Sequence, residues 1–323
     1  MRYSFLAVAI IASVLLGGCA TTPSPYQNMP ITTNVTVQNT FTLAPGQDVV
    51  GRTQYIQSAR GDTLSLLAQR YDIGYEEILA ANSTINPNKR IPTDTVIALP
   101  TMWVLPPAKY RKGIVINIPD LRLYYFSGDQ VSTFPVALGR EGWRTPLATT
   151  YVYRKTADPT WHVPDSIRQY YFQKYGQEQA PEVGPGPDNP LGKYAIYLHM
   201  PGYLIHGTND QSSVGHFVSS GCIRMYAPDI EQLFNAVSKG VPASIIYYPS
   251  LAGWREGKLY LSAREQIVHE QGLYQVHEVY PVDAVQEAVG IRPAEVNWIK
   301  VNSVVSAHTG IPAVIGRELS VSN

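Results

Sequence analysis

The stretch Val218-Ser219-Ser220-Gly221-Cys222-Ile223-Arg224-Met225 decides how this 323-residue chain is interpreted, because it contains one of only two cysteines. Sixteen positions upstream (222 minus 206), Ile205-His206-Gly207-Thr208 places a histidine after an apolar run, where a strand is expected to end. A free thiol has a pKa of about 8.5 and needs a base to attack a carbonyl at neutral pH. Histidine suits that role. The two stretches predict that Cys222 is a nucleophile and His206 its base, with His216 as an alternative base.

The residues around Cys222 suit a site for a reacting carbonyl group. Gly221 permits a tight turn and a close approach of substrate, and backbone N–H groups at Gly221 and Cys222 are expected to face the developing oxyanion. Arg224 is able to hold a carboxylate in a forked geometry, and a structural ion pair is its alternative role. A metal site built from His206, His216 and Cys222 fits no familiar zinc spacing. No metal and no cofactor are therefore predicted.

Alternating apolar residues predict a mainly β domain over about residues 110–250. Residues 113–118 and 121–126 are expected to form a hairpin, and further strands are expected at 131–138, 149–154, 194–200 and 243–248. One helix is expected over 228–237, where Pro228 suits the first turn. Residues 155–193 are irregular and rich in Pro and Gly, and a loop of this length is usually functional or mobile.

Together these motifs resemble the L,D-transpeptidase (YkuD) family over about 110–250. Supporting matches are Phe134-Pro135-Val136, Arg144-Thr145-Pro146, Pro159-Thr160-Trp161 and Asn189-Pro190-Leu191-Gly192. The resemblance implies a β-sandwich catalytic domain with Cys222 as nucleophile, His206 as proton acceptor and donor, and the Gly207 carbonyl orienting the imidazole. It also implies substrate binding by Ser219, Ser220, Gly221 and Arg224. The chain departs from the family at Ser220, where His is frequent, and at Ala148, where Gly is usual.

The resemblance implies an enzyme that acts on the tetrapeptide stems of peptidoglycan. Cys222 would form an acyl-enzyme and release D-Ala, and an amine would then take the acyl group. The product would be a 3→3 cross-link or a protein attached to the cell wall, with a cell-wall-anchored lipoprotein as a further acceptor. Two alternatives stay open. Water as acceptor would give an L,D-carboxypeptidase, and an inactive domain would leave a peptidoglycan-binding lipoprotein.

A smaller unit is predicted over residues 54–100. Leu64, Leu67, Ala68 and Tyr71 recur at helical spacing, and strand-like runs flank two short helices. The βααβ order, Gly61-Asp62-Thr63-Leu64 and the turn in Ala81-Asn82…Ile85-Asn86-Pro87 resemble a LysM module. That resemblance implies binding to the glycan of peptidoglycan, and a small domain that only packs on its neighbour is the alternative.

The N-terminal residues 1–18 are typical of a signal peptide, because their apolar run is too short to span a bilayer. Leu16-Gly17-Gly18-Cys19 resembles a lipobox, which implies lipidation of Cys19 and anchoring in the membrane. Ala20 in place of Asp suggests the outer membrane, facing the periplasm. An ordinary cleaved signal peptide is the alternative. Residues 19–53 are rich in Thr, Pro, Asn and Gln and are expected to form a flexible tether.

Charge excludes one class of partner. Lys plus Arg and Asp plus Glu both number 25, so no basic field indicates nucleic acid binding. Residues 251–323 form a C-terminal extension of unknown role. Strands are expected near Tyr260 and over 273–280, and a helix is expected over 293–307.

Overall fold

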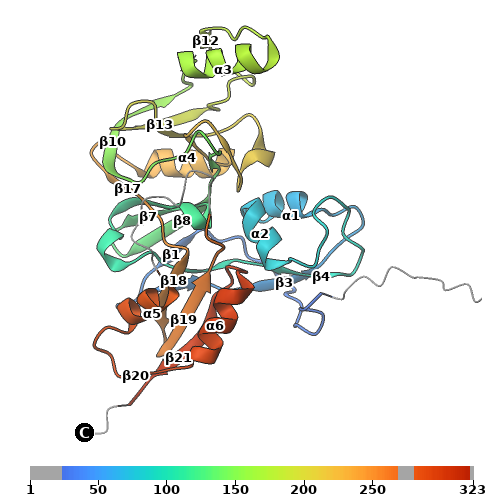
Figure 1. The fold of residues 1–323 in the computed structure, drawn as a ribbon, viewed down its shortest axis with the longest axis vertical. Helices are drawn as coiled ribbons and strands as arrows, with labels where there is room; N and C mark the ends of the chain where they lie inside the picture. The colour runs from blue at the N-terminus through green and yellow to red at the C-terminus, as the bar shows by residue number, and fades with distance from the viewer. Residues whose placement is uncertain (1–23, 268–279, 321–323) are drawn as a thin grey trace, which may run out of the picture.

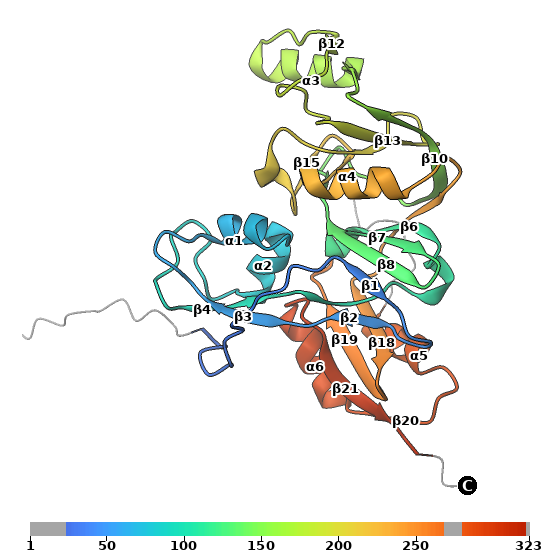
Figure 2. The ribbon, with the colours of Figure 1, turned by 180° about the vertical axis from the view of Figure 1, so that it is seen from behind.

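The computed structural model describes residues 24–267 and 280–320. A central sheet lies between a lobe that carries α3 and a C-terminal unit that carries α5 and α6, and helices α1 and α2 lie beside it (Figures 1 and 2). Cys19 and the predicted signal peptide lie outside the described residues. Within those residues, no helix combines the length and the apolarity that a membrane span requires.

The central sheet has nine strands in the order β1-β8-β7-β6-β17-β10-β13-β14-β16. Its strands are β1 (Thr40–Thr42), β6 (Gly113–Asn117), β7 (Arg122–Ser127), β8 (Gln130–Pro135), β10 (Ala148–Ala157), β13 (Tyr194–Leu198), β14 (Leu204–His206), β16 (Ile223–Arg224) and β17 (Pro242–Ile246). The β17–β6 and β14–β16 pairs are parallel, and the other pairs are antiparallel. The prediction of a mainly β domain is confirmed.

Both halves of the sheet contribute to one apolar core. Ile116 lies in one half, Ile205 and Ile223 lie in the other, and all three side chains are buried. Helix α4 (Ala227–Ala236) adds Leu233 to this core. Side chains along a strand alternate between its faces, so the residues next to Ile205 and Ile223 point to the opposite face. That face carries the candidate site.

The predicted βααβ unit is confirmed. Its elements are β3 (Gln54–Gln57), α1 (Leu64–Arg70), α2 (Tyr75–Ala81) and β4 (Val96–Leu99), and β3 pairs with β4 in the antiparallel sense. The Thr63 hydroxyl accepts a hydrogen bond from the Leu66 N–H (3.2 Å) and caps α1. Leu64 and Leu67 are buried against the two strands, as their spacing predicts.

The expectation of a flexible tether over 19–53 differs from the structure. Strand β1 adds to the edge of the central sheet, with Phe41 opposite Val131. Strand β2 (Val49–Gly51) pairs with β5 (Met102–Val104), and Val49 and Val50 are buried. The segment has too few apolar residues to fold alone, but partners distant in sequence supply the missing surface.

The C-terminal extension is a folded unit. Its sheet has the order β18-β19-β21-β20, from β18 (Ser250–Arg255), β19 (Lys258–Ala263), β20 (Ala294–Val296) and β21 (Ala313–Glu318), with α5 (Pro281–Val289) and α6 (Trp298–Ala307). The strand predicted near Tyr260 is confirmed. The helix predicted over 293–307 begins later, because a strand occupies 294–296. The strand predicted over 273–280 lies almost entirely outside the described residues.

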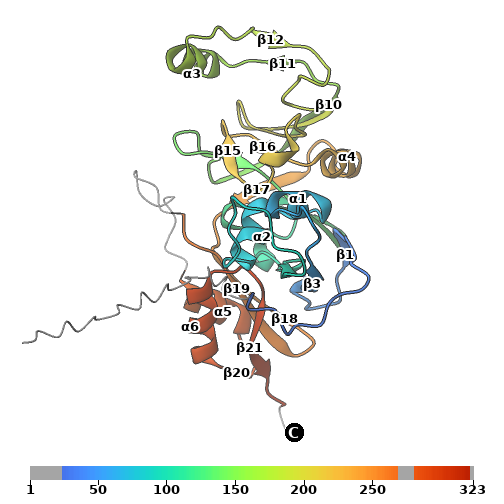
Figure 3. The ribbon, with the colours of Figure 1, turned by 90° about the vertical axis from the view of Figure 1, so that its right-hand side faces the viewer.

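The irregular segment 155–193 forms the lobe that projects from β10 and β13 (Figure 1), with α3, β11 and β12 at its far end (Figure 3). It contains β11 (Trp161–His162), α3 (Asp165–Tyr175) and β12 (Glu182–Val183). The remaining elements are β9 (Leu138–Gly139), β15 (Phe217–Ser219), η1 (Ala108–Tyr110), η2 (Ile118–Asp120) and η3 (Gln211–Ser213). Strands β9 and β15 pair in parallel beside the site.

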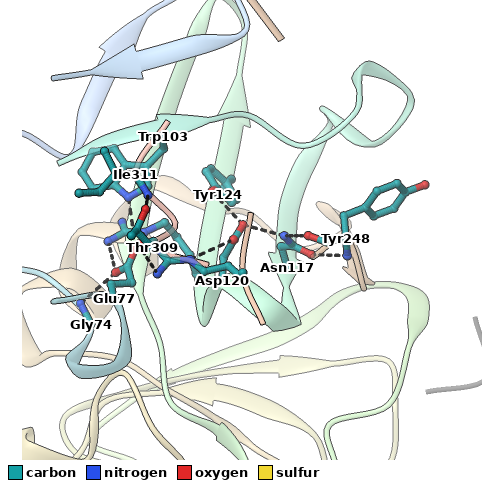
Figure 4. A network of polar contacts seen from close by, with 11 residues as sticks. Gly74, Glu77, Trp103, Asn117, Asp120, Tyr124, Tyr248, Thr309 and Ile311 are labelled. Carbon is teal, nitrogen blue, oxygen red and sulfur yellow. Dashed lines mark hydrogen bonds and ion pairs between the residues drawn. The ribbon is translucent and has the colours of Figure 1, made fainter. Parts of the chain in front are cut away.

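A buried ion pair and its neighbours join the βααβ unit, the central sheet and the C-terminal unit (Figure 4). Glu77 of α2 accepts two hydrogen bonds from Arg122 of β7, at 2.9 Å from Nε and 2.7 Å from Nη2. Both side chains are 1% exposed. Trp103 Nε1 donates to Glu77 at 3.2 Å, and Arg264, from the end of the C-terminal unit's second strand, lies 3.4 Å from it. Burial alone would raise the Glu77 pKa, but Arg122, with help from Arg264 and the Gly74 N–H, outweighs burial and lowers it.

We expect Glu77→Ala to lower the free energy of unfolding by about 3–5 kcal/mol, because it leaves the Arg122 charge buried without a partner. Glu76→Ala, on the same helix, is the matched control. Glu76 pairs with His216 and is 46% exposed, so its loss should cost no more than about 1 kcal/mol. Urea unfolding of both variants measures the difference. If both variants lowered the free energy of unfolding by the same small amount, the role given to Glu77 would be contradicted.

Candidate active site

Cys222 lies in a tight loop between β15 and β16. The Ser219 hydroxyl donates to the Cys222 carbonyl (2.6 Å) and accepts from the Gly221 N–H (3.1 Å). The Thr145 hydroxyl donates to the Gly221 carbonyl (2.8 Å) and accepts from the Gly139 N–H (3.0 Å). These four bonds fix the backbone on both sides of the nucleophile.

Two sequence-based expectations change with this loop. Ser219 is predicted to bind substrate, but it is buried and its hydroxyl is used inside the loop. The Gly221 N–H is expected to face an oxyanion, but it is bonded to Ser219, which leaves the Cys222 N–H as the candidate donor. Ser220 is half-buried beside the loop.

Gly221 is required for a steric reason. Its φ of +104° lies in a region that side-chain-bearing residues rarely adopt, and a Cβ atom there would lie 3.0 Å from the Tyr203 ring.

His206 ends β14, as expected, and its ring is held by the next residue. Its Nδ1 lies 2.6 Å from the Gly207 carbonyl oxygen. Since a carbonyl only accepts, Nδ1 carries the hydrogen and Nε2 keeps a free lone pair. This is the arrangement that the family resemblance implies for Gly207.

The strand register brings His206, Cys222 and Arg224 to one face. In the parallel pair β14–β16, Ile205 lies opposite Ile223 and His206 opposite Arg224. Ile205 and Ile223 point into the core, so His206 and Arg224 share the other face, and Cys222 follows the same alternation. Strands lie about 4.8 Å apart and rise about 3.3 Å per residue, which puts the Cα atoms of Cys222 and His206 about 8 Å apart.

Burial and Arg224 set the protonation states of the pair. Burial first, and then the positive charge of Arg224, lower the pKa of His206 to about 3, against hydrogen bonds to Gly207 and Leu191 that favour the charged ring. Burial raises the pKa of the Cys222 thiol, although the Leu204 N–H and Arg224 act in the opposite direction. The resting pair is therefore a neutral thiol and a neutral imidazole. The thiol itself donates to the Gly202 carbonyl at 3.4 Å.

Arg224 is available to a ligand. Its backbone bonds to Ala137, but its buried Nε has no hydrogen-bond partner. None of the ion pairs among residues 24–267 and 280–320 involves Arg224. This weakens the alternative that Arg224 serves only in a structural ion pair. Burial lowers the pKa of the guanidinium, whereas Cys222 and Asp210 raise it. A positive charge beside the nucleophile, with an unused donor, suits a carboxylate ligand.

The contacts of His216 do not suit it to act as the base for Cys222. Its Nδ1 lies 3.2 Å from Glu76 Oε1, and its ring stacks on Tyr75 at 4.4 Å. Both partners belong to the βααβ unit, so His216 is part of the contact with that unit.

Three residues near the nucleophile had no assigned role in the sequence. Thr145 holds the nucleophile loop, and Gly202 and Tyr203 form the turn that Cys222 contacts. Only Thr145 carried a signal, because it lies in one of the supporting motifs. The other two reach the site through the β13–β14 hairpin, which sequence alone does not align with Cys222.

Comparison with known proteins gives a consistent result. The family model of the L,D-transpeptidase catalytic domain matches residues 111–245, and the LysM domain model matches residues 59–100. The probable L,D-transpeptidase YcfS of Escherichia coli is 39% identical over 65% of this chain and 68% of its own length. The probable L,D-transpeptidase ErfK/SrfK of the same species is 32% identical over 85% of this chain and 90% of its own length.

We expect the His206 ring to stay neutral from pH 8 to pH 5, because its pKa of about 3 lies below that range. The ring would gain a proton only as the pH falls toward 3. Nitrogen NMR shifts of the imidazole measure this directly. Arg224→Gln should raise this pKa, since it removes a repelling charge, and the backbone spectrum serves as the control for folding. A midpoint near 6.5 in the wild-type protein would contradict the description of the site.

Proposed function

Because the chain belongs to the L,D-transpeptidase family, we propose that Cys222 forms an acyl-enzyme with the tetrapeptide stem of peptidoglycan and passes the acyl group to an amine. The observation that carries this proposal is the His206–Gly207 hydrogen bond at 2.6 Å. It leaves Nε2 free to accept a proton on the face that carries Cys222.

The first half of the reaction forms a thioester. His206 Nε2 takes the thiol proton as Sγ attacks the carbonyl carbon of the bond before the terminal D-Ala. The Cys222 N–H would stabilise the negative oxygen that develops. The C–N bond then breaks, the leaving amine takes the proton from Nε2, and D-Ala departs. Arg224 is positioned to pair with the free carboxylate of that D-Ala before it leaves.

The second half reverses these steps with a new amine. The acceptor attacks the thioester carbonyl and gives a proton to Nε2. The C–S bond breaks, and the thiolate regains its proton from the imidazolium. The low basicity of His206 helps both departures, because a weak base is a strong acid once protonated. An amine of a neighbouring stem gives a 3→3 cross-link, and an amine of a protein gives attachment to the wall.

We further propose that the LysM unit binds the glycan and that Cys19 carries the lipid that holds the enzyme at the outer membrane, in the periplasm. The support is the LysM match and the Leu16-Gly17-Gly18-Cys19 sequence. A glycan-bound module would raise the local concentration of stems near Cys222.

Incubation with disaccharide-tetrapeptide, followed by mass spectrometry, tests the reaction. We expect a thioester on Cys222 and a cross-linked dimer. His206→Ala should acylate about 10²-fold more slowly at pH 7, and should recover in part only above pH 8.5, because burial raises the thiol pKa. Cys222→Ser is the control that should recover at no pH. A tripeptide product without any dimer would make water the acceptor, and no adduct at all would reject the proposal.

Lipidation is tested separately. Cys19→Ser should release the protein into the soluble fraction or stop its processing, whereas Cys222→Ser should leave fractionation unchanged. The mass of the mature protein reports the lipid directly. An unchanged mass and unchanged membrane association in Cys19→Ser would reject the anchor.

A further inference from the structure

A cluster of aromatic side chains lies in solvent on β10 and β13. Tyr151 and Tyr153 are 40% and 39% exposed. Tyr151 stacks on His199 at 4.6 Å, and Tyr153 contacts Tyr197 edge to face at 6.2 Å. The Arg154 guanidinium lies 3.9 Å above the Tyr197 ring. We call these five residues the aromatic shelf.

The strand register places the shelf on the catalytic face. Tyr197 lies opposite Leu204 in the β13–β14 pair. Ile205 lies opposite Ile223, so the preceding residues, Leu204 and Cys222, also lie side by side. Arg154 lies opposite Tyr197 in the β10–β13 pair. One row of residues therefore runs from Cys222, just before β16, through Leu204 of β14 and Tyr197 of β13 to Arg154 of β10.

The side chains of the shelf do not contribute to the apolar core of the catalytic domain. Val152, between the two tyrosines, is fully buried in the main core, whereas its neighbours Tyr151 and Tyr153 point outward. A bulge in the β10–β13 register, between Val152 and Arg154, turns Tyr153 and Arg154 to the same side. Solvent-exposed rings held by mutual stacking on a catalytic face are typical of a binding surface rather than of packing.

We propose that the aromatic shelf binds the sugar to which the donor stem peptide is attached. This rests on the proposed function. A pyranose ring has an apolar C–H face and a polar rim, which matches a tyrosine ring with its negative face and polar hydroxyl. The exposed guanidinium of Arg154 adds a donor for sugar hydroxyls or for a free carboxylate of the stem.

The reach of the stem agrees with this placement. Three strand spacings separate Cys222 from Arg154, which is about 14 Å at about 4.8 Å each. Three residues lie between the sugar and the scissile bond, and an extended chain spans about 3.5 Å per residue. The second residue is linked through its side-chain carboxyl, which adds about two bonds, so the stem spans about 13 Å. With its reacting carbonyl at Cys222, an extended stem would place the sugar over the shelf.

The test compares two donors, the disaccharide-tetrapeptide and the same tetrapeptide without sugar. For each donor, kcat/KM for acylation of Cys222 is measured by mass spectrometry, and the ratio of the two values is the readout. We expect the wild-type ratio to exceed one and to fall about tenfold in Tyr153→Ala and further in the double variant Tyr151→Ala/Tyr153→Ala. Tyr153→Phe keeps the ring and should keep most of the ratio. Trp298→Ala removes a 46% exposed aromatic residue of the C-terminal unit and should leave the ratio unchanged.

Each other outcome overturns a separate claim. A wild-type ratio of one, or a ratio that the shelf variants do not change, overturns the sugar site while leaving the transpeptidase intact. If neither donor acylates Cys222, the result contradicts the proposed function instead. A shelf variant that acylates normally but no longer transfers to the acceptor would assign the shelf to the acceptor. Thermal unfolding of each variant separates these results from loss of fold.

Discussion

The carboxylate of Glu77 cannot lie in the interior without a cation, and this constraint holds the molecule together. Arg122 supplies the cation through two parallel hydrogen bonds and stacks on Trp103 at 4.3 Å. The residues come from the LysM unit, the central sheet and the strand between them, and Arg264 adds the C-terminal unit. Moving the LysM unit away would leave charges buried without partners. The LysM unit is therefore fixed relative to Cys222, and is not attached by a free linker.

The same docking positions the catalytic loop. Gly215 meets the start of α2 so closely that a Cβ atom on it would lie 2.0 Å from the Tyr75 backbone nitrogen. Its carbonyl accepts from the Glu76 N–H at 3.2 Å. Strand β15 begins two residues later and leads directly into the loop of Cys222. A glycan strand held by the LysM unit would thus be fixed relative to the strand that precedes the nucleophile.

The sequence predicted the parts of the fold that depend on local patterns. Helical spacing at Leu64 and Leu67 predicted the first helix of the βααβ unit, and Gly221 next to Cys222 predicted the tight turn that carries the candidate nucleophile. Prediction from the sequence failed where strands pair with partners that are distant in the chain. Strand β1 has three residues and is stabilised by β8, about ninety residues later, so its polar composition suggested a tether. Ser219 was misassigned for a similar reason, because a hydroxyl next to a nucleophile binds substrate or closes a turn, and only the backbone path distinguishes the two.

The charge of Arg224 acts on both members of the catalytic pair, and its effect depends on what it binds. It lowers the pKa of Cys222 and also that of His206, so it favours the thiolate and disfavours the imidazolium. These two effects oppose each other in the transfer of a proton from Sγ to Nε2, which the burial of both groups makes unfavourable. A substrate carboxylate at Arg224 would cancel much of the repulsion felt by His206 and strengthen the base, and it would also cancel the attraction that favours the thiolate. Once D-Ala had left with that carboxylate, the repulsion would return, and the imidazolium formed in the second half of the proposed reaction would return its proton to the thiolate more readily. What occupies Arg224 would thus set both how readily Cys222 loses its proton and how readily His206 accepts it.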